Sequence, residues 1–319
     1  MNLQEIYELC IETGIKADPR GESGIKNALE KAQKTYASLS EKKKQYFDQE
    51  GLKNPYSDSR ILYGDPKTVV DKVLAGIDID TGEVLLADKL RDKQGVDLVW
   101  GHHPHGAALA ALDEVMDIQV DLLVAEGVPV NVAEGVLRER IEEVKRKIGP
   151  HNHFQSVDAA RLLNMPFMVV HTITDNLAHK FMSELVQKTN PQTVGDIMEM
   201  LETIPEYQLA MKAGTPPMIS SGSEKNRAGK VAVLGFTGGT EGSKEIYERL
   251  AASGVGTSID MHLGEEHLKE ARKHHINIVV AGHMVSDSLG TNLMLDELEK
   301  RGVTIIPCSG LIRVSRVKK

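Results

Sequence analysis

The segment VWGHHPHG, residues 99–106, places three histidines within four positions, directly after an apolar run. The three are His102, His103 and His105. Imidazole is an unusual choice for a buried core, but it is a common ligand of divalent transition metals. The cluster therefore raises the hypothesis of a metal site.

Two further segments have the same arrangement of an apolar run followed by ligand-type residues. MVVHTITDN contains His171 and Asp175, and IVVAGHMVSD contains His283 and Asp287. Ligands of open α/β sheets bind at the carboxyl ends of the strands, so three such ends predict one shared cleft. Imidazole and carboxylate ligands without a nearby cysteine favour Zn, Fe, Mn or Co.

The two adjacent histidines leave a choice between one ion and two. Neighbouring side chains on a regular strand point to opposite faces, so His102 and His103 cannot both reach one ion from a strand. A turn at Gly101 and Pro104 could direct both into one cavity. Alternatively, each histidine could hold a different ion, which would indicate a two-metal site.

Other polar segments are weaker candidates. Asp260 and His262 also follow an expected strand and could either line the same cleft or be structural. The Gly-rich loop 235–243 could hold phosphate, but it lacks the ending of a P-loop, so a tight turn is the simpler interpretation. Four more histidines are expected at the surface or at a helix end: His151, His153, His274 and His275.

The elements that must position these residues alternate between strand and helix. The expected strands span residues 69–79, 96–100, 167–172, 230–236, 255–261, 276–283 and 303–308. The expected helices span residues 82–95, 106–125, 131–147, 157–164, 176–189, 243–253, 264–275 and 287–301. This alternation predicts an α/β fold with largely parallel or mixed sheets.

The simplest division of the chain is two α/β halves with a connecting segment. The expected parts are a polar helical N-terminal extension (1–60), a first half (61–190) with a helical insertion at about 107–150, a connecting segment (191–229) and a second half (230–319). Within the connecting segment, residues 213–229 are rich in Pro, Gly and Ser and are expected to form an exposed loop.

Composition excludes several classes of function. The 319-residue chain has a formal net charge of −8, which makes a nucleic-acid partner unexpected. Long apolar runs and a signal-peptide pattern are lacking, so no membrane span or export is expected. The two cysteines, Cys10 and Cys308, have no motif around them, which favours the reducing cytoplasm.

Taken together, these motifs resemble those of the NIF-three-like family, also called GTP cyclohydrolase I type 2 homologues, toroidal proteins with a dinuclear metal site. GHHPHG resembles the family's His-His-Pro motif, and VVHTITD resembles its His-Thr-x-x-Asp motif. VAVLGFTGG and the block from SIDMHLGEEH to GHMVSD resemble the beginning and end of its second half. The resemblance extends from about Leu62 to the C-terminus.

The resemblance implies the NIF-three-like fold, with the metal site in the cleft between the two halves. It implies two divalent ions per chain and five ligands: His102, His103, Asp175, His283 and Asp287. His171 would lie beside the site. The family also implies a homo-oligomer, such as a hexamer, and an activity like that of GTP cyclohydrolase.

The chain departs from the family pattern at two places. Asp287 stands where the family usually has the longer Glu, and the segment between His103 and Asp175 is longer than expected. The backbone could therefore lie closer to the site here, Asp287 could bind one ion rather than bridge two, or a water molecule could fill the gap. Asp287 could also merely cap the helix expected at 287–301.

Charge indicates what such a site would bind. Two divalent ions carry more positive charge than Asp175 and Asp287 neutralise, which favours an anionic substrate such as a nucleotide or another phosphorylated small molecule. The leading hypothesis is a metal-dependent hydrolase. The alternatives are a non-enzymatic, ring-forming metal-binding or regulatory protein, and a nucleotide-binding protein that uses the 235–243 loop without metal.

Overall fold

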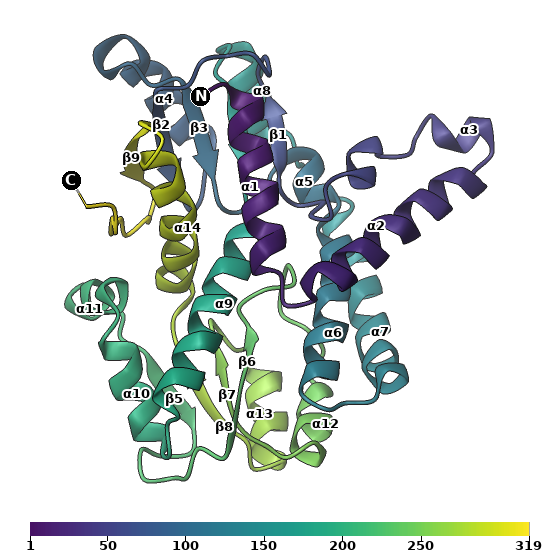
Figure 1. Cartoon of the computed structure of the whole chain (residues 1–319), viewed down its shortest axis with the longest axis vertical. Helices are drawn as coiled ribbons and strands as arrows, with labels where there is room; N and C mark the ends of the chain where they lie inside the picture. Colours follow the sequence, from purple (N-terminus) through teal and green to yellow (C-terminus); the bar gives the residue numbers. More distant parts are fainter. Residues whose placement is uncertain (319) are drawn as a thin grey trace.

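The computed structural model describes residues 1–318 and has two mixed β-sheets packed between helices (Figure 1). The first sheet contains five strands in the order β1-β4-β3-β2-β9, and the second contains four in the order β5-β8-β7-β6. Each sheet has an antiparallel strand at one edge, and its other strands are parallel. The predicted α/β fold with mixed sheets is confirmed.

The first sheet is built from both ends of the chain. Its strands are β1 (Arg60–Tyr63), β2 (Lys72–Gly76), β3 (Leu98–Gly101), β4 (Phe167–Val169) and β9 (Thr304–Cys308). β9 pairs in parallel with β2, so the last strand of the expected second half completes the first sheet. A division of the chain at one point along the sequence therefore does not separate the two sheets.

The second sheet begins in a segment that was expected to be a loop. Its strands are β5 (Met218–Ser221), β6 (Lys230–Gly235), β7 (Val255–Asp260) and β8 (Asn277–Val280). β5 lies within residues 213–229, so the prediction of a loop there is wrong for these four residues. An edge strand has a neighbour on one side only, and this one needs few apolar side chains to pair with β8.

The two sheets share one topology. β1–β4 and β5–β8 follow the same strand order, with the antiparallel strand beside the last parallel one. A long helix follows each last strand: α9 (Thr172–Thr189) after β4 and α14 (His283–Glu299) after β8. The sequence His-x-x-x-Asp lies at both strand–helix junctions, as residues 171–175 and 283–287.

Helices cover both faces of each sheet. Besides α9 and α14, they are α1 (Leu3–Ala17), α2 (Gly21–Ser38), α3 (Glu41–Lys44), α4 (Thr81–Gln94), α5 (Gly106–Ala110), α6 (Ile118–Ala125), α7 (Val130–Ile148), α8 (Gln155–Leu162), α10 (Val194–Glu202), α11 (Pro205–Lys212), α12 (Ile246–Ala252) and α13 (Glu265–Lys273). Single 3-10 turns lie at Gln49–Leu52 and Leu112–Asp117. None of the helices in the described part of the chain combines the length and the apolar character needed to cross a bilayer.

The N-terminal segment consists of two parts with different roles. α1 buries Leu3 and Ile6 against the first sheet in the same core as Trp100, so it is an integral part of that layer. α2 projects away from the body of the molecule and buries only Ile25 (Figure 1). The prediction of a polar helical extension therefore describes α2 and α3 but not α1.

The helices of the expected insertion at 107–150 pack on the second sheet. Leu123 of α6 and Leu137 of α7 share a core with Leu234 and Ile278 of the sheet. The single helix expected over 106–125 is broken into α5, a 3-10 turn and α6. This segment, which leaves the first sheet after β3, therefore forms one face of the second.

Helices α9 and α14 approach each other so closely that one glycine is required. A Cβ atom on Gly290 would lie 2.1 Å from the carbonyl oxygen of Thr174, far inside van der Waals contact. Both helices also begin earlier than expected, at Thr172 and His283. As a result, Asp175 and Asp287 lie in the first turns of two tightly packed helices.

We predict that Gly290→Ala lowers the free energy of unfolding by about 1–3 kcal/mol, because the added methyl group must push α9 and α14 apart. Gly135→Ala is the matched control, since Gly135 is exposed within α7 and a Cβ there meets nothing within 4 Å. The control should be neutral or stabilising by up to about 1 kcal/mol, as helix propensity favours Ala. Denaturant unfolding of both variants checks this, and equal stabilities would contradict it.

Candidate metal centre

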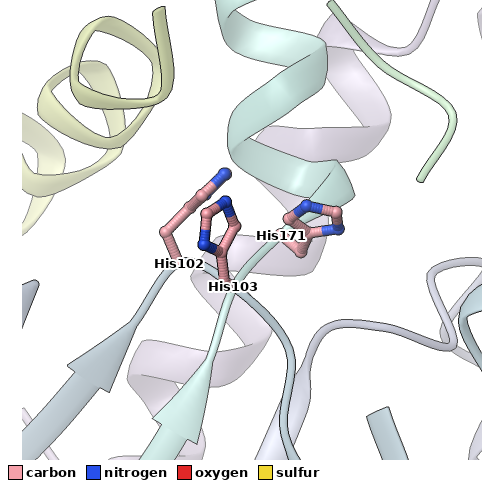
Figure 2. Close-up of side chains that lie close together, drawn as sticks. All are labelled: His102, His103 and His171. Atoms are coloured by element: carbon pink, nitrogen blue, oxygen red, sulfur yellow. The ribbon is translucent and has the colours of Figure 1, made fainter. Parts of the chain in front are cut away.

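Three imidazole rings meet where two strands of the first sheet end (Figure 2). His102 and His103 follow β3, and His171 links β4 to the start of α9. The ring centroid of His102 lies 5.1 Å from that of His103 and 4.9 Å from that of His171. The strand-end rule therefore placed these side chains correctly with respect to one another.

The helices bring the acidic residues to the same point. Nε2 of His102 lies 3.5 Å from Oδ1 of Asp175 and 3.5 Å from Oδ1 of Asp287. These three residues are almost fully buried, and their ligand atoms are close enough together to hold one ion.

A second group of ligand atoms uses the other oxygen of the same carboxylate. Oδ2 of Asp287 lies 3.4 Å from Nε2 of His103 and 3.3 Å from Nε2 of His283. This set also satisfies the spacing needed for one ion. His102 and His103 each join one of these groups, and the two also form a third group with His171. The ligand spacing therefore accommodates either one ion or two.

The position of Asp287 in its helix excludes the capping alternative. Gly282 is the N-cap of α14, and Asp287 lies one turn into the helix, beyond the capping position. Its carboxylate presents one oxygen to each group, which is the arrangement of a bridging ligand. From this position the two side-chain oxygens of Asp287 lie 3.3–3.5 Å from imidazole nitrogens.

The donor atoms of the centre fit a cation. Nε2 of His102, Oδ1 of Asp175 and both side-chain oxygens of Asp287 are buried and have no hydrogen-bond partner among the described residues. Buried polar atoms normally have partners, because leaving them unpaired costs free energy. Four such atoms converging on one point are explained if divalent cations are their partners.

The opposite nitrogen of each ring is held in place by a neighbouring residue. Nδ1 of His103 donates to Asp78 at 2.6 Å, and Nδ1 of His171 donates to Asp58 at 2.8 Å. Nδ1 of His102 lies 2.9 Å from Oγ1 of Thr174. Such partners fix the orientation and tautomer of metal-binding imidazoles, leaving Nε2 to face the ion.

Two of these supporting residues escaped sequence analysis. Asp78 follows β2, so the same strand-end rule could have identified it. Asp58 precedes the antiparallel strand β1, where no pattern in the sequence marked it. It reaches His171 only because β1 pairs with β4.

The pKa values of His102 and Asp287 are both shifted by their buried surroundings. Burial lowers the pKa of His102 to about 4, so this ring is neutral at pH 7 and suited to bind metal. Burial raises the pKa of Asp287, but its contacts with His102 and His103 outweigh this effect and hold the pKa well below its usual range.

His171 and Asp175 influence each other in the same buried space. Burial by itself lowers the pKa of His171, but the carboxylates of Asp175 and Asp58 raise it to about 9. Burial raises the pKa of Asp175 to about 8. A nearby cation favours the ionised form of a carboxylate, so metal binding would displace a proton from Asp175.

The remaining candidates lie outside the two groups. The ring of His262 lies 4.7 Å from that of His283 and lines the adjoining pocket, whereas the oxygens of Asp260 accept hydrogen bonds from Gly235 and Ser258. His105 lies 3.0 Å from the hydroxyl of Ser156. Among the described residues, none of these three joins a metal-ligand group, and neither does any of the four histidines that were expected at the surface or at a helix end: His151, His153, His274 and His275.

We predict that Asp287→Asn lowers the affinity for both ions, because one carboxylate serves both groups. Asp175→Asn is the matched comparison and should weaken only the ion held with His102. The expected loss exceeds the roughly 10–100-fold typical when an outer partner of a ligand is removed. Metal titration followed by elemental analysis checks the stoichiometry, and an Asp287→Asn protein with two tightly bound ions would refute the bridging role.

Comparison with solved structures supports the resemblance noted in the sequence. A NIF3 superfamily protein from Sphaerobacter thermophilus shares 26% identity with the chain over 98% of it and 99% of that protein, with a TM-score of 0.77. Reduced HcgD from Methanocaldococcus jannaschii shares the fold at 14% identity, over 83% and 94% of the two chains, with a TM-score of 0.51. No family model matches the sequence, and no curated protein is significantly similar to it. The chain therefore has the fold of the NIF3-like proteins, which supports the resemblance that its motifs indicate.

Proposed function

We propose that this protein is a hydrolase that depends on two divalent metal ions and acts on a small anionic molecule, such as a nucleotide or another phosphorylated compound. The observation that carries the proposal is the buried carboxylate of Asp287, which presents one oxygen to each of two ligand groups. Asp175 and His102 complete one group, and His103 and His283 complete the other. Zn, Fe, Mn and Co suit these nitrogen and oxygen ligands.

The chemistry of such a centre is general. When bound, two divalent ions lower the pKa of a water molecule and stabilise negative charge on a substrate oxygen. The protein orients the ligands through Thr174, Asp78 and Asp58. It also buries one side of the centre while leaving His103 and His283 partly exposed, with 24% and 39% of their side chains accessible. An anionic substrate can therefore approach from that side.

His171 is placed to assist proton transfer. It lines the pocket beside the centre, and its Nε2 lies 3.8 Å from Oδ2 of Asp175. Asp58 binds the opposite nitrogen and also accepts a hydrogen bond from Thr172, so the ring is held firmly. We propose that Nε2 of His171 exchanges a proton with the substrate or its leaving group.

Two further parts of the proposal depend on the family resemblance. GTP is one phosphorylated compound to include in a substrate screen, given the name that the family carries. Assembly into a homo-oligomer, such as a hexamer, is proposed on the same basis, whereas a cytoplasmic location is proposed from the two cysteines without a motif.

The decisive experiment combines metal content with turnover. The chain is stripped with a chelator, reconstituted separately with Zn, Mn, Co and Fe, and measured by elemental analysis. We expect two ions per chain. We also expect metal-dependent turnover of at least one compound in a panel of phosphate esters and nucleotides, detected as release of phosphate or as hydrolysis of a nucleotide base. Two bound ions without turnover of any compound would favour the non-enzymatic alternative, and failure to take up metal would refute the proposal.

We predict that Asp58→Asn lowers kcat by about 10–100-fold while both ions stay bound, because the variant keeps the size of the side chain but loses the charge that orients His171. KM should change little, since Asp58 does not line the pocket. Steady-state kinetics, elemental analysis and thermal unfolding separate this effect from misfolding. Unchanged kcat would show that His171 does not need this partner.

A further inference from the structure

A pocket extends from the metal centre toward the second sheet. Its lining begins at His171, Asp175, His283 and Asp287 and continues to the loop after β6. Its cavity volume is about 90 Å³. That is several times the roughly 10–15 Å³ that one water molecule requires, so the pocket has room for a group of the size of a ring.

Part of the pocket lining is apolar. α6 contributes Leu122 and Leu123, α12 contributes Ile246 and Tyr247, and the loop after β6 contributes Phe236. Pockets for small molecules typically combine such walls with a few placed polar groups. These side chains can therefore contact an apolar group of a ligand.

The charges along the pocket disfavour a second anionic group. Neither lysine nor arginine lines it among the described residues, whereas the carboxylates of Glu241 and Asp260 do. The guanidinium of Arg140 is directed elsewhere, to the backbone oxygen of Glu241 and to Glu143. A polyphosphate chain would have no cation to neutralise it beyond the metal centre.

One carboxylate oxygen is available to bind a donor. Oε1 of Glu241 accepts a hydrogen bond from the backbone of Gly264 at 2.7 Å, while Oε2 lies 3.6 Å from Nε2 of His267, too far for a good hydrogen bond. Both oxygens of Asp260 already accept hydrogen bonds within the protein. Oε2 of Glu241 can therefore accept a hydrogen bond from an N–H group on a ligand.

The Gly-rich loop forms a rigid rim rather than a phosphate cradle. Gln119 of α6 donates to the carbonyl oxygens of Gly238 and Thr240, both at 2.7 Å. A Cβ on Gly238 would lie 2.6 Å from Cγ of Gln119, and its φ of +95° also requires glycine. The glycine at 238 thus allows the loop to lie close to α6. The hydrogen bonds from Gln119 hold the loop in this position without a ligand.

We propose that this pocket binds an uncharged aromatic or heteroaromatic ring of the substrate, with an N–H donor directed to Glu241, while the single anionic end of the same molecule lies at the metal centre. The proposal rests on the proposed function of that centre. It narrows the substrate class to compact molecules with one anionic group and one neutral ring, and it makes α6 a determinant of specificity.

Calorimetry with phosphonates, which resist hydrolysis, tests the proposal on the metal-loaded protein. We expect phenylphosphonate to bind at least tenfold more tightly than methylphosphonate, because the two share the anionic end and differ in the ring. A 4-amino group on the ring should preserve or improve binding. A 4-carboxylate should weaken binding at least tenfold, because it would face Glu241 and Asp260.

Two substitutions in the pocket and one outside it locate the effect. Leu122→Gln should reduce the preference for the ring to threefold or less, and the partly exposed Ile246→Thr should reduce it in the same direction if the first variant folds poorly. Val124→Gln is the matched control on α6, since Val124 is 40% exposed and outside the lining. It should leave the preference unchanged.

The outcomes separate failure of this proposal from failure of the proposed function. Equal affinities for phenyl- and methylphosphonate, or an undiminished ring preference in both pocket variants, would overturn the ring pocket while leaving the metal centre intact. Tighter binding of the 4-carboxylate would overturn the assignment of a neutral ring. Failure of methylphosphonate to bind metal-loaded protein at all would instead count against the anion-binding function of the centre.

Discussion

The structure depends on one buried carboxylate. Asp287 is 1% exposed, and neither of its side-chain oxygens has a hydrogen-bond partner among the described residues. Burying such a charge is strongly unfavourable unless it is paired. Three imidazole nitrogens, from His102, His103 and His283, lie 3.3–3.5 Å away, and divalent ions between them and the carboxylate would compensate for the burial. Metal binding at the centre would therefore increase the free energy of unfolding.

The fold positions this carboxylate by packing two equivalent junctions against each other. In both sheets the last parallel strand leads into a long helix whose first turn carries an aspartate. Gly290 allows these helices to approach closely at Thr174, next to Asp175. Each sheet thereby delivers a histidine and an aspartate to the shared boundary.

The segments outside the two motifs hold this boundary in place. Asp18, at the end of α1, accepts hydrogen bonds from Tyr56 and Asn176, and Asn176 in turn accepts one from Thr237 of the Gly-rich loop. The N-terminal segment is thereby connected to the helix that carries Asp175 and to the rim of the pocket. α6, from the long segment after β3, clamps the same loop through Gln119. Both regions are thus connected to the Gly-rich loop that borders the pocket, and Asp58 of the N-terminal region also contacts His171 directly.

The sequence alone was sufficient for the α/β class, and it marked His102, His103, Asp175, His283 and Asp287 as ligand-type residues that follow strands. These strands belong to two different sheets, so the meeting of His283 and Asp287 with the other three was decided by the packing of α14 against α9. It could not decide whether Asp287 bridges or caps, since that depends on where α14 begins, and helix ends are set by local contacts rather than by periodicity. Nor could it show Asp58, which reaches His171 through strand pairing between distant segments. The tertiary structure likewise decides that β9 joins the first sheet and that α6 packs on the second. An apolar strand or helix face indicates that the element is buried, but it does not identify the element that covers it.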